Sequence, residues 1–467
     1  MRRTKLICTI GPSTESVEVL ERMFAKGVEV ARLNMSHAKH DWTRTMVARL
    51  REISARASHP CAIMVDTQGP AIRTGEMPIP MHLKPGDVFE FTVKGARSEE
   101  EKSVDVNYDN LVRDIDVGDT VLVDNGVMRL RVLQKLHRRI RCEVLTEGEL
   151  GSRRHINLPG VKVSMPSITE KDRRDIALGV ELGVDLIALS FVRERKDIEE
   201  LRELLANAKS DAKIIAKIED QQSVENIGEL IEAADAIMVA RGDLGIECPY
   251  EELPIIQRRI VKACLKYGRP VIVATHMLES MIENPMPTRA EVTDVANAVF
   301  EQADAVMLSG ETTVGKYPLE CIEVIHRIAE RIERSGGAGY AERAELKDER
   351  QKVVRSAVVM ANELRAKGIL VFTRHGYMAK FTSWLRPRYS PIFAFTNSER
   401  LRNQMNLLWG VSPFVIQFSD DPETTILRAQ SVVKERGLLR AGDQVVIISD
   451  ILAREKLINA VQMRLVE

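Results

Sequence analysis

The sequence Ile214-Ile215-Ala216-Lys217-Ile218-Glu219 and the later Ala236-Ile237-Met238-Val239-Ala240-Arg241-Gly242-Asp243 are two apolar runs that each end in a charged cluster. Runs this apolar are typical of parallel strands buried on both faces, where a charge is costly unless it is paired or binds a metal. Lys217 and Glu219 are two residues apart, so on a strand their side chains lie on the same side. Two carboxylates and a lysine that converge at strand ends predict a divalent cation beside a fixed positive charge, a combination suited to an anionic substrate.

Six further apolar runs end in polar side chains in the same way, at residues 6–9, 28–32, 62–66, 186–190, 271–275 and 305–309. Most are followed by a helical pattern, such as the apolar stripe of Leu20, Met23 and Phe24 after Ser16, with Gly27 placed as a C-terminal cap. Eight parallel strands that alternate with helices predict an α/β fold, the (β/α)8 TIM barrel, whose active sites lie at the C-terminal ends of the strands. A doubly wound open sheet is the alternative, and the count of eight strands favours the barrel.

Two interruptions of this alternation predict two more domains. Residues 74–164 are rich in short alternating segments and turns such as Lys84-Pro85-Gly86-Asp87, which predicts a small inserted β-barrel that overhangs the active site as a lid. The TIM barrel then comprises residues 1–73 and 165–335. Beyond a glycine-rich stretch at 335–339, strand patterns at 369–372, 392–395, 414–418 and 445–448 alternate with helical ones. They predict a C-terminal α/β domain over 345–467, for which we expect a regulatory role.

Composition narrows the class of protein further. The chain has 467 residues and a net charge of −1, so its charge balance indicates neither a nucleic-acid partner nor a membrane surface. Its six cysteines are scattered without a C-x-x-C pair, which favours reduced packing residues over a disulfide framework or a zinc site. With no signal-like segment and no long uncharged apolar run, we expect a cytoplasmic protein.

Polar segments follow one another at the predicted strand ends in a specific order. In chain order they are Thr4–Pro12, Ala31–His37, Asp66–Thr74, Lys217–Glu219, Ala240–Gly245, Ala274–Met281, Pro287–Glu291 and Ser309–Thr312. Together they resemble the pyruvate kinase family, and the resemblance extends over nearly the whole chain. It implies transfer of the phosphoryl group of phosphoenolpyruvate to ADP, which gives pyruvate and ATP in the final step of glycolysis, by a homotetramer.

Within this resemblance, the pair of strand ends quoted first carries the chemistry. Glu219 and Asp243 match the family's ligands for the substrate-bound Mg²⁺ or Mn²⁺, a hard cation that prefers carboxylate oxygens. Lys217 matches the lysine that stabilises the moving phosphoryl group and the developing enolate. Arg32 matches the arginine that holds the phosphoryl group, for which its planar fork is suited.

The resemblance also assigns the carboxylate and carbon ends of the substrate. The backbone amides around Gly242 and Asp243 match the groups that hold the substrate carboxylate. Thr275 matches a threonine near the enolate carbon, on the route by which pyruvate is protonated. Since a threonine hydroxyl is a poor acid, this role requires a water that relays the proton.

Nucleotide contacts are implied for Asn34, Ser36, His37 and Arg73. Arg73 can equally serve as a hinge of the lid. The turn Asp124-Asn125-Gly126 in the lid is expected either to touch the active site on closure or to be a plain turn.

A monovalent-cation site is also implied, because the family builds it from counterparts of Asn34, Ser36, Asp66 and Thr67. A glutamate characteristic of K⁺-dependent members is replaced here by Ala71, and the usual lysine after the threonine is Gln68. Members that do without K⁺ typically carry a lysine in place of that glutamate. Ala71 supplies neither charge, so we expect K⁺ to bind, but less tightly.

The C-terminal domain departs from members that are activated by fructose-1,6-bisphosphate. The loop Thr373-Arg374-His375-Gly376-Tyr377-Met378 offers almost no hydroxyl donors besides Thr373. The segment 449–453 continues into a helical pattern where a glycine-rich closing loop is expected. We therefore expect no activation by this bisphosphate, although Arg374 and His375 could bind another phosphorylated effector.

Two rival functions remain open at this point. A magnesium-dependent aldolase or another phosphoenolpyruvate-using barrel would also bind an enolate through carboxylates, but would not need the lid, Arg73 or the C-terminal domain. A non-catalytic regulatory paralogue would fit the substitutions at Gln68 and Ala71, but not the intact set of Lys217 and its partners.

Overall fold

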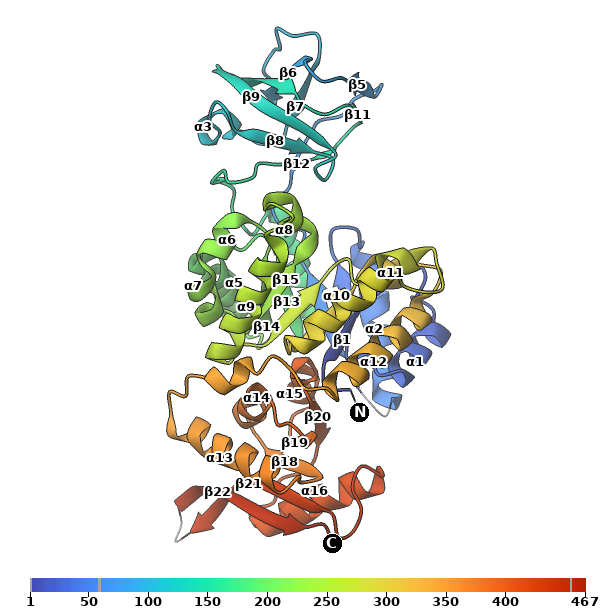
Figure 1. Cartoon of the computed structure of the whole chain (residues 1–467), viewed down its shortest axis with the longest axis vertical. Coiled ribbons are helices and arrows are strands. Elements are labelled where there is room, and N and C mark those ends of the chain that lie inside the picture. The colour runs from blue at the N-terminus through green and yellow to red at the C-terminus, as the bar shows by residue number, and fades with distance from the viewer. Residues whose placement is uncertain (1, 58–59, 454–455) are drawn as a thin grey trace.

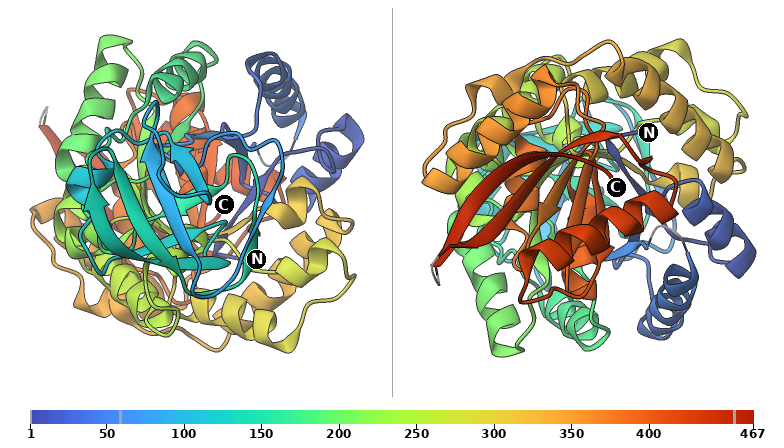
Figure 2. Two further views of the ribbon diagram at one scale, coloured as in Figure 1. Left: turned by 90° about the horizontal axis from the view of Figure 1, so that it is seen from above. Right: turned by 90° about the horizontal axis from the view of Figure 1, so that it is seen from below.

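The computed structural model describes residues 2–57, 60–453 and 456–467. They form three bodies stacked along the long axis of the molecule, with the inserted lid at one end, the barrel in the middle and the C-terminal domain at the other end (Figure 1). Views along this axis show that the lid and the C-terminal domain lie over opposite ends of the barrel (Figure 2). Within the described ranges, no helix has the length and apolarity needed to cross a membrane.

The middle body is a closed barrel of eight parallel strands in the order β1-β17-β16-β15-β14-β13-β3-β2. Its strands are β1 (Lys5–Thr9), β2 (Val30–Asn34), β3 (Ala62–Asp66), β13 (Leu186–Leu189), β14 (Lys213–Ile218), β15 (Ala236–Ala240), β16 (Val271–Ala274) and β17 (Ala305–Leu308). Each of the eight predicted apolar runs supplies one of them, so the predicted TIM barrel is confirmed.

Helices follow the strands and form the outer layer of the barrel. They are α1 (Val17–Ala25), α2 (His40–Arg56), α4 (Glu170–Glu181), α5 (Arg195–Asn207), α6 (Gln221–Glu225), α7 (Ile227–Ala233), α8 (Arg241–Glu247), α9 (Leu253–Tyr267), the 3-10 turn η1 (Glu279–Ile282), α10 (Arg289–Phe300), α11 (Gly310–Thr313) and α12 (Pro318–Glu333). The first is built as predicted: the Ser16 side chain accepts a hydrogen bond from Val19 N, and Gly27 follows the helix in the left-handed conformation, with φ of 81°.

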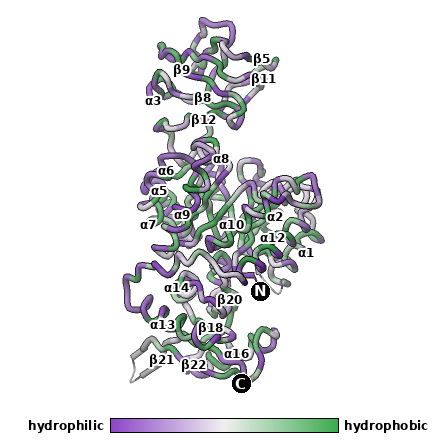
Figure 3. The backbone as a smooth tube through the Cα atoms, in the orientation of Figure 1, coloured by the Kyte–Doolittle hydropathy of each residue, from purple (hydrophilic) through white to green (hydrophobic). Residues whose placement is uncertain are grey.

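The barrel strands are buried on both faces, as their continuous apolar sequences require. Outward-pointing residues form one core with the surrounding helices, and inward-pointing residues fill the barrel in a second core. Leu407 from the C-terminal domain belongs to this inner core and closes the floor of the barrel. Hydrophobic stretches of the chain accordingly run through the middle of each body, while many surface loops are hydrophilic (Figure 3).

The lid is a separate β structure with its own core. Its elements are β4 (Ile72–Arg73), β5 (Met81–Leu83), β6 (Val88–Val93), β7 (Ser103–Val106), α3 (Leu111–Asp114), β8 (Thr120–Val123), β9 (Met128–Leu136), β10 (Arg139–Val144), β11 (Gly148–Leu150) and β12 (His155–Asn157). Seven strands form a sheet in the order β4-β12-β8-β9-β10-β6-β7, and a bridge between Thr74 and Val106 joins its two ends.

The C-terminal domain is a five-stranded sheet in the order β20-β19-β18-β21-β22, with helices packed against it. The 3-10 turn η2 (Tyr340–Arg343) precedes the domain and packs against α9 of the barrel. The elements of the domain are α13 (Glu349–Glu363), β18 (Gly368–Phe372), α14 (Tyr377–Trp384), β19 (Ile392–Thr396), α15 (Glu399–Gln404), η3 (Met405–Leu407), β20 (Val411–Val415), α16 (Pro422–Glu435), β21 (Gln444–Ala453) and β22 (Lys456–Leu465).

Two predictions for this domain were wrong in detail. The strand predicted at 414–418 is β20, which begins three residues earlier at Val411. The helical pattern expected beyond residue 449 is instead a long hairpin, in which β21 pairs antiparallel with β22 from Gln444 opposite Leu465 to Ala453 opposite Lys456. The segment is a strand because it forms backbone hydrogen bonds with another strand further along the chain. A local sequence pattern does not reveal such pairing.

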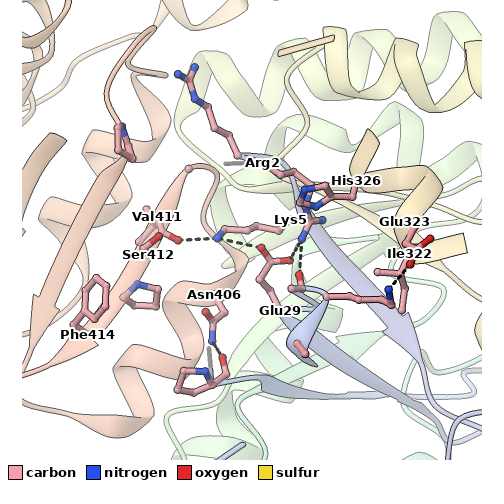
Figure 4. A pocket seen from close by; sticks show the side chains of 18 of the residues that line it. Arg2, Lys5, Glu29, Ile322, Glu323, His326, Asn406, Val411, Ser412 and Phe414 are labelled. Carbon is pink, nitrogen blue, oxygen red and sulfur yellow. Dashed lines mark hydrogen bonds and ion pairs between the residues drawn. The ribbon is translucent and has the colours of Figure 1, made fainter. Parts of the chain in front are cut away.

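The C-terminal domain packs against the N-terminal end of the barrel, away from the strand ends that carry the predicted site. Arg386 Nη2 pairs with Asp304 Oδ2 at 2.8 Å across this contact. Beside it lies a cavity of about 690 Å³ between α12, the start of β1 and β20 (Figure 4). Lys5 Nζ bridges its two walls by donating to the Val411 carbonyl oxygen at 2.7 Å.

Candidate active site

Most of the predicted site residues lie at the C-terminal ends of the barrel strands. These strand ends are on the side of the barrel that faces the lid (Figure 1). Arg32 lies in β2, Asp66 ends β3 and Lys217 lies in β14. Thr275 directly follows β16, and Asp243 lies in the first turn of α8, which begins immediately after β15. Parallel strands of one barrel present these ends at the same rim, which brings together residues far apart in the sequence.

Lys217 is the centre of this cluster and is buried. Its Nζ atom lies 2.9 Å from Glu219 Oε1, 3.1 Å from Asp66 Oδ1 and 2.7 Å from the Ser190 hydroxyl. Burial opposes the charged form, but the Asp66 and Glu219 carboxylates outweigh it and raise the pKa of Lys217. The lysine is therefore a fixed ammonium at neutral pH.

Asp66 joins Lys217 to the second cation of the site. Arg32 Nε donates to Asp66 Oδ2 at 2.6 Å, and Arg32 Nη1 donates to the Thr9 hydroxyl at 2.8 Å. Burial alone would raise the pKa of Asp66, yet the Lys217 and Arg32 charges hold it below its usual value. One buried carboxylate thus orients both an ammonium and a guanidinium toward the mouth of the barrel.

This bridging role of Asp66, and the contact of Ser190 with Lys217, were not predicted. The sequence signal for both is the same: each polar residue directly follows an apolar strand, as Lys217 and Glu219 do. What the sequence does not contain is the register, which sets Arg32 beside Met64 and Asn34 beside Asp66 in neighbouring strands.

Glu219 and Asp243 form the candidate metal site. Glu219 is buried, and its Oε2 atom accepts the Phe191 backbone N–H at 2.6 Å. Burial raises the pKa of Glu219 to about 7, and the nearby Asp243 carboxylate adds to the rise while Lys217 opposes it. A divalent cation between the two carboxylates would relieve this unfavourable interaction, so the donor set fits Mg²⁺ or Mn²⁺. Across the described part of the chain, no three His, Cys, Asp or Glu side chains are grouped as metal ligands, so substrate and water oxygens would have to complete the coordination.

Thr275 lies in a constrained loop beside Gly242. Thr275 and the following His276 both have positive φ, 66° and 54°. This conformation is rare for a β-branched residue such as Thr275. Arg241 holds this backbone by donating from Nη2 to the Thr275 carbonyl oxygen at 2.6 Å and from Nη1 to Asp294 at 2.7 Å. The Thr275 hydroxyl accepts the Gly242 N–H at 2.8 Å, so the predicted carboxylate-binding amide is occupied by the predicted proton-route residue.

The residues predicted to face the nucleotide lie in two places. Ser36 and His37 are exposed just beyond β2, where Asn34 Oδ1 accepts the Ser36 N–H at 3.1 Å. Arg73 lies in β4 of the lid sheet, and its Nη1 atom donates to the Arg153 carbonyl oxygen at 3.1 Å. The guanidinium is thus held by the lid itself, at the point where the chain leaves the barrel.

Of the four predicted monovalent-cation ligands, the barrel register sets Asn34 beside Asp66, with Thr67 next in the chain. Each Asp66 oxygen has a cationic partner, and the Thr67 carbonyl oxygen accepts the Ser190 hydroxyl at 2.7 Å. A monovalent cation would therefore have to share these oxygens with groups that already use them.

The lid turn at Asp124 and Asn125 is a tight turn with positive φ of 56° at both residues. It also lies against the barrel, because a Cβ atom placed on Gly126 would be 3.7 Å from the Ile246 side chain in α8. The turn is an ordinary reversal of the chain next to the helix that carries Asp243, and its contact with the active site on lid closure stays a prediction.

Comparisons with known proteins agree with this geometry. A family model described as "Pyruvate kinase, barrel domain" matches residues 1–322, and one described as "Pyruvate kinase, alpha/beta domain" matches residues 351–461. The chain is 43% identical to plastidial pyruvate kinase 3 of Arabidopsis thaliana, over 99% of the chain and 82% of that protein. It is 39% identical to a pyruvate kinase of Staphylococcus aureus, over 97% of the chain and 78% of that protein. The crystal structure of a pyruvate kinase from Cryptosporidium parvum superposes with a TM-score of 0.95 at 34% identity, and covers 100% of this chain and 96% of that one.

Proposed function

Because the chain belongs to the pyruvate kinase family and is a phosphotransferase, we propose that Lys217 and Arg32 carry the transfer of a phosphoryl group from phosphoenolpyruvate to ADP. The observation that supports this most directly is the Asp66 carboxylate, which holds both cations at once, at 3.1 Å and 2.6 Å. Phosphoryl transfer offers little covalent chemistry to the protein, so fixed charges that neutralise the migrating group supply most of the catalysis. The shared carboxylate fixes both cations in place, so they need little rearrangement when the phosphoryl group arrives.

Glu219 and Asp243 would hold the divalent cation, because a cation between them would relieve the repulsion between their carboxylates. When bound, Mg²⁺ or Mn²⁺ neutralises charge on phosphoryl and enolate oxygens and helps to orient them. Glu219 is fixed for this role through its contacts with Lys217 at 2.9 Å and with the Phe191 N–H at 2.6 Å.

Thr275 and Gly242 would act on the other end of the substrate. A substrate carboxylate that accepts the Gly242 N–H would compete with the Thr275 hydroxyl, which now accepts it. The hydroxyl would then be free to orient a water that protonates the enolate carbon. Arg241 keeps the threonine at this place by its bonds to the Thr275 carbonyl oxygen.

We assign contacts with the nucleotide phosphates to Asn34, Ser36, His37 and Arg73. Since Arg73 lies in β4 of the lid sheet, the position of the lid determines whether Arg73 reaches the nucleotide. K⁺ remains the proposed monovalent ion, with oxygens of Asn34, Ser36, Asp66 and Thr67 as ligands. Turnover in K⁺ compared with a tetraalkylammonium salt tests this part: we expect activity to depend on K⁺ with weak affinity, and full activity without K⁺ would exclude the site.

The proposed roles are tested by production of pyruvate in a coupled assay with phosphoenolpyruvate, ADP and Mg²⁺. Lys217→Met removes the central cation, and we expect kcat to fall by about three orders of magnitude or more, as for loss of a major charge-stabilising group. Lys213→Met is the matched control, because Lys213 begins the same strand at the opposite end of the barrel. Pyruvate release without ADP would indicate an aldolase-type or hydrolytic reaction, and a folded but inactive wild-type protein would indicate a regulatory paralogue.

Regulation and assembly are also part of the proposal. In the loop after β18, the Thr373 hydroxyl accepts the Gly376 N–H at 2.9 Å, and Arg374 stacks on Phe418 at 5.5 Å. Because this loop offers almost no hydroxyl donors besides Thr373, we expect no activation by fructose-1,6-bisphosphate. A titration with strong activation would contradict this. A homotetramer and a cytoplasmic location stay predictions, and four of the plant relatives are named as chloroplastic enzymes.

A further inference from the structure

The last strand of the lid is tied to the helix that carries Asp243. Asn157 ends β12, and its Nδ2 atom donates to Glu247 Oε1 at 2.8 Å. Glu247 is the last residue of α8, and its carbonyl oxygen accepts Gln221 Nε2 from α6 at 2.6 Å. We name Asn157, Glu247 and Gln221 the lid pivot, since they lie where the chain returns from the lid to the barrel.

The lid pivot is a costly arrangement for a purely structural contact. Asn157 is 3% exposed and Glu247 is 8% exposed. Asn157 Oδ1 is buried and, among the described residues, has no hydrogen-bond partner. Burial raises the pKa of Glu247 to about 7 in spite of the Asn157 hydrogen bond, and the Asp220 and Asp243 carboxylates add to the rise while Arg193 opposes it. An apolar pair of similar size would avoid these penalties, which suggests that the polar contact has a use.

The position of the lid pivot indicates what this use is. α8 has seven residues, with Gly242 and Asp243 in its first turn and Glu247 at its end, so roughly 6 Å of rigid helix separates Asp243 from Glu247. Asn157 is the residue of β12 that contacts α8, through Glu247 at the end of this helix. The rigid helix therefore joins the end of the last lid strand to Asp243.

Two further features relate the lid to α8 and to Arg73: the lid turn at Gly126 and the pairing of β4 with β12. Gly126 of the lid turn lies next to Ile246, the neighbour of Glu247. β4, which contains Arg73, pairs with β12 from His155 to Ile156. A movement of the lid about Asn157 would thus carry Arg73 with it, while Glu247 transmits the movement to α8.

We propose that Asn157 and Glu247 are positioning residues that couple the placement of the lid to the placement of Asp243. In the proposed function, on which this inference rests, Arg73 faces the nucleotide and Asp243 binds the metal. The lid pivot then makes the two substrate sites interdependent: binding of ADP under the lid orients α8, and a correctly placed Asp243 favours the closed lid. A contact that served only for stability would not link these two affinities.

The test compares Glu247→Met, which removes the acceptor at similar length, with Glu247→Gln, which keeps one. Glu225→Met is the matched control, because Glu225 is an exposed glutamate at the end of neighbouring α6. For Glu247→Met we expect kcat to fall by about tenfold to a hundredfold and the KM for ADP to rise by about tenfold, from the loss of one buried hydrogen bond that positions α8. Glu247→Gln should recover kcat and KM to within about threefold, and Glu225→Met should behave as wild type.

Two more measurements keep the proposal open to refutation. Asn157→Leu and the double variant complete a cycle, in which the two losses should not add because both remove the same contact. Hydrogen exchange of the full-length protein, measured without substrates, should increase in the segments around β12 and α8 in Glu247→Met. This readout does not depend on activity, so it separates a failure of the lid pivot from a failure of the proposed function.

Unchanged exchange in both segments, additive losses in the cycle, or kcat and KM values of folded Glu247→Met within twofold of wild type would each overturn the proposal. If Glu247→Met does not fold, Asn157→Leu replaces it in the same comparison. In that case we expect the same rise in the KM for ADP, and an unchanged KM would overturn the coupling.

Discussion

Asp66→Asn is the most informative single change in the active site, because it removes one charge that orients two cations. Asp66 is fully buried, and its two oxygens separately contact Arg32 and Lys217. The asparagine has nearly the same shape but no charge, and only one of its two atoms can accept a hydrogen bond. We expect the protein to fold. Without the negative charge between them, Arg32 and Lys217 would be held less firmly and would repel each other more strongly.

The size of the effect follows from the contacts that are lost and those that remain. Breaking one partner out of a buried ion pair costs about 3–5 kcal/mol. Lys217 keeps Glu219 at 2.9 Å and the Ser190 hydroxyl at 2.7 Å, and Arg32 keeps Thr9 at 2.8 Å. The loss in unfolding free energy should therefore be smaller than this, about 2–4 kcal/mol. If a similar amount is lost from the transition state, kcat falls by about 30-fold to 1,000-fold.

The assay measures kcat at saturating phosphoenolpyruvate, ADP, Mg²⁺ and K⁺, with urea unfolding of the same preparation. Asp185→Asn is the control, because Asp185 is a buried carboxylate at the opposite end of the barrel that pairs with Arg51 at 2.9 Å. It should lose stability but keep its kcat. An Asp66→Asn enzyme with more than about a tenth of the wild-type kcat would refute the positioning argument. Recovery of full activity at high K⁺ would show instead that Asp66 acts mainly as a cation ligand.

Three further changes test other parts of the molecule. Arg241→Lys keeps the charge, but a lysine cannot reach the Thr275 carbonyl oxygen and Asp294 together. We therefore expect kcat to fall about tenfold in steady-state kinetics. An unchanged kcat would show that the Thr275 backbone keeps its conformation without Arg241. Burial lowers the pKa of Lys380 from 10.5 to about 8, so the folded protein holds its ammonium unfavourably below pH 8, and this penalty is lost as the pH rises toward 10.5. Lys380→Met should thus raise the unfolding free energy by about 1–3 kcal/mol at pH 7 but hardly at pH 10.5 in urea titrations, and an equal gain at both values would contradict the assignment. Gly268→Ala should lower the unfolding free energy by about 1–3 kcal/mol, because Gly268 has φ of 71° and a Cβ atom there would lie 2.7 Å from the Trp384 ring. Gly228→Ala in α7 is the control: its Cβ atom would meet no atom within 4 Å, so this change should be neutral or stabilising.

Much of the barrel was predictable because its signals are local. Continuous apolar runs identify strands buried on both faces, and polar residues at their ends identify the rim with the active site. For the same reason Lys217, Glu219, Asp243 and Arg32 could be singled out before their contacts were known. Their order along the chain was enough to suggest the family.

The features that were missed all depend on a partner far along the chain. Asp66 meets Arg32 and Lys217 through the register of neighbouring strands, which no local pattern encodes. The strand predicted at 414–418 begins instead at Val411 and includes Pro413, which is tolerated because β20 lies at the edge of its sheet. The hairpin of β21 and β22 is likewise decided by pairing and not by the preference of either segment.

Leu407 in the floor of the barrel has a consequence for how the protein is made. All eight barrel strands and their helices are complete in the sequence by Glu333, whereas Leu407 comes from the middle of the next domain. During synthesis, all the barrel strands and helices thus emerge from the ribosome before Leu407 does. At that stage the apolar interior of the barrel is still open to water at one end. Until the C-terminal domain emerges, this exposed apolar surface favours aggregation of the nascent chain. The catalytic half of this enzyme acquires its last core residue from its neighbour.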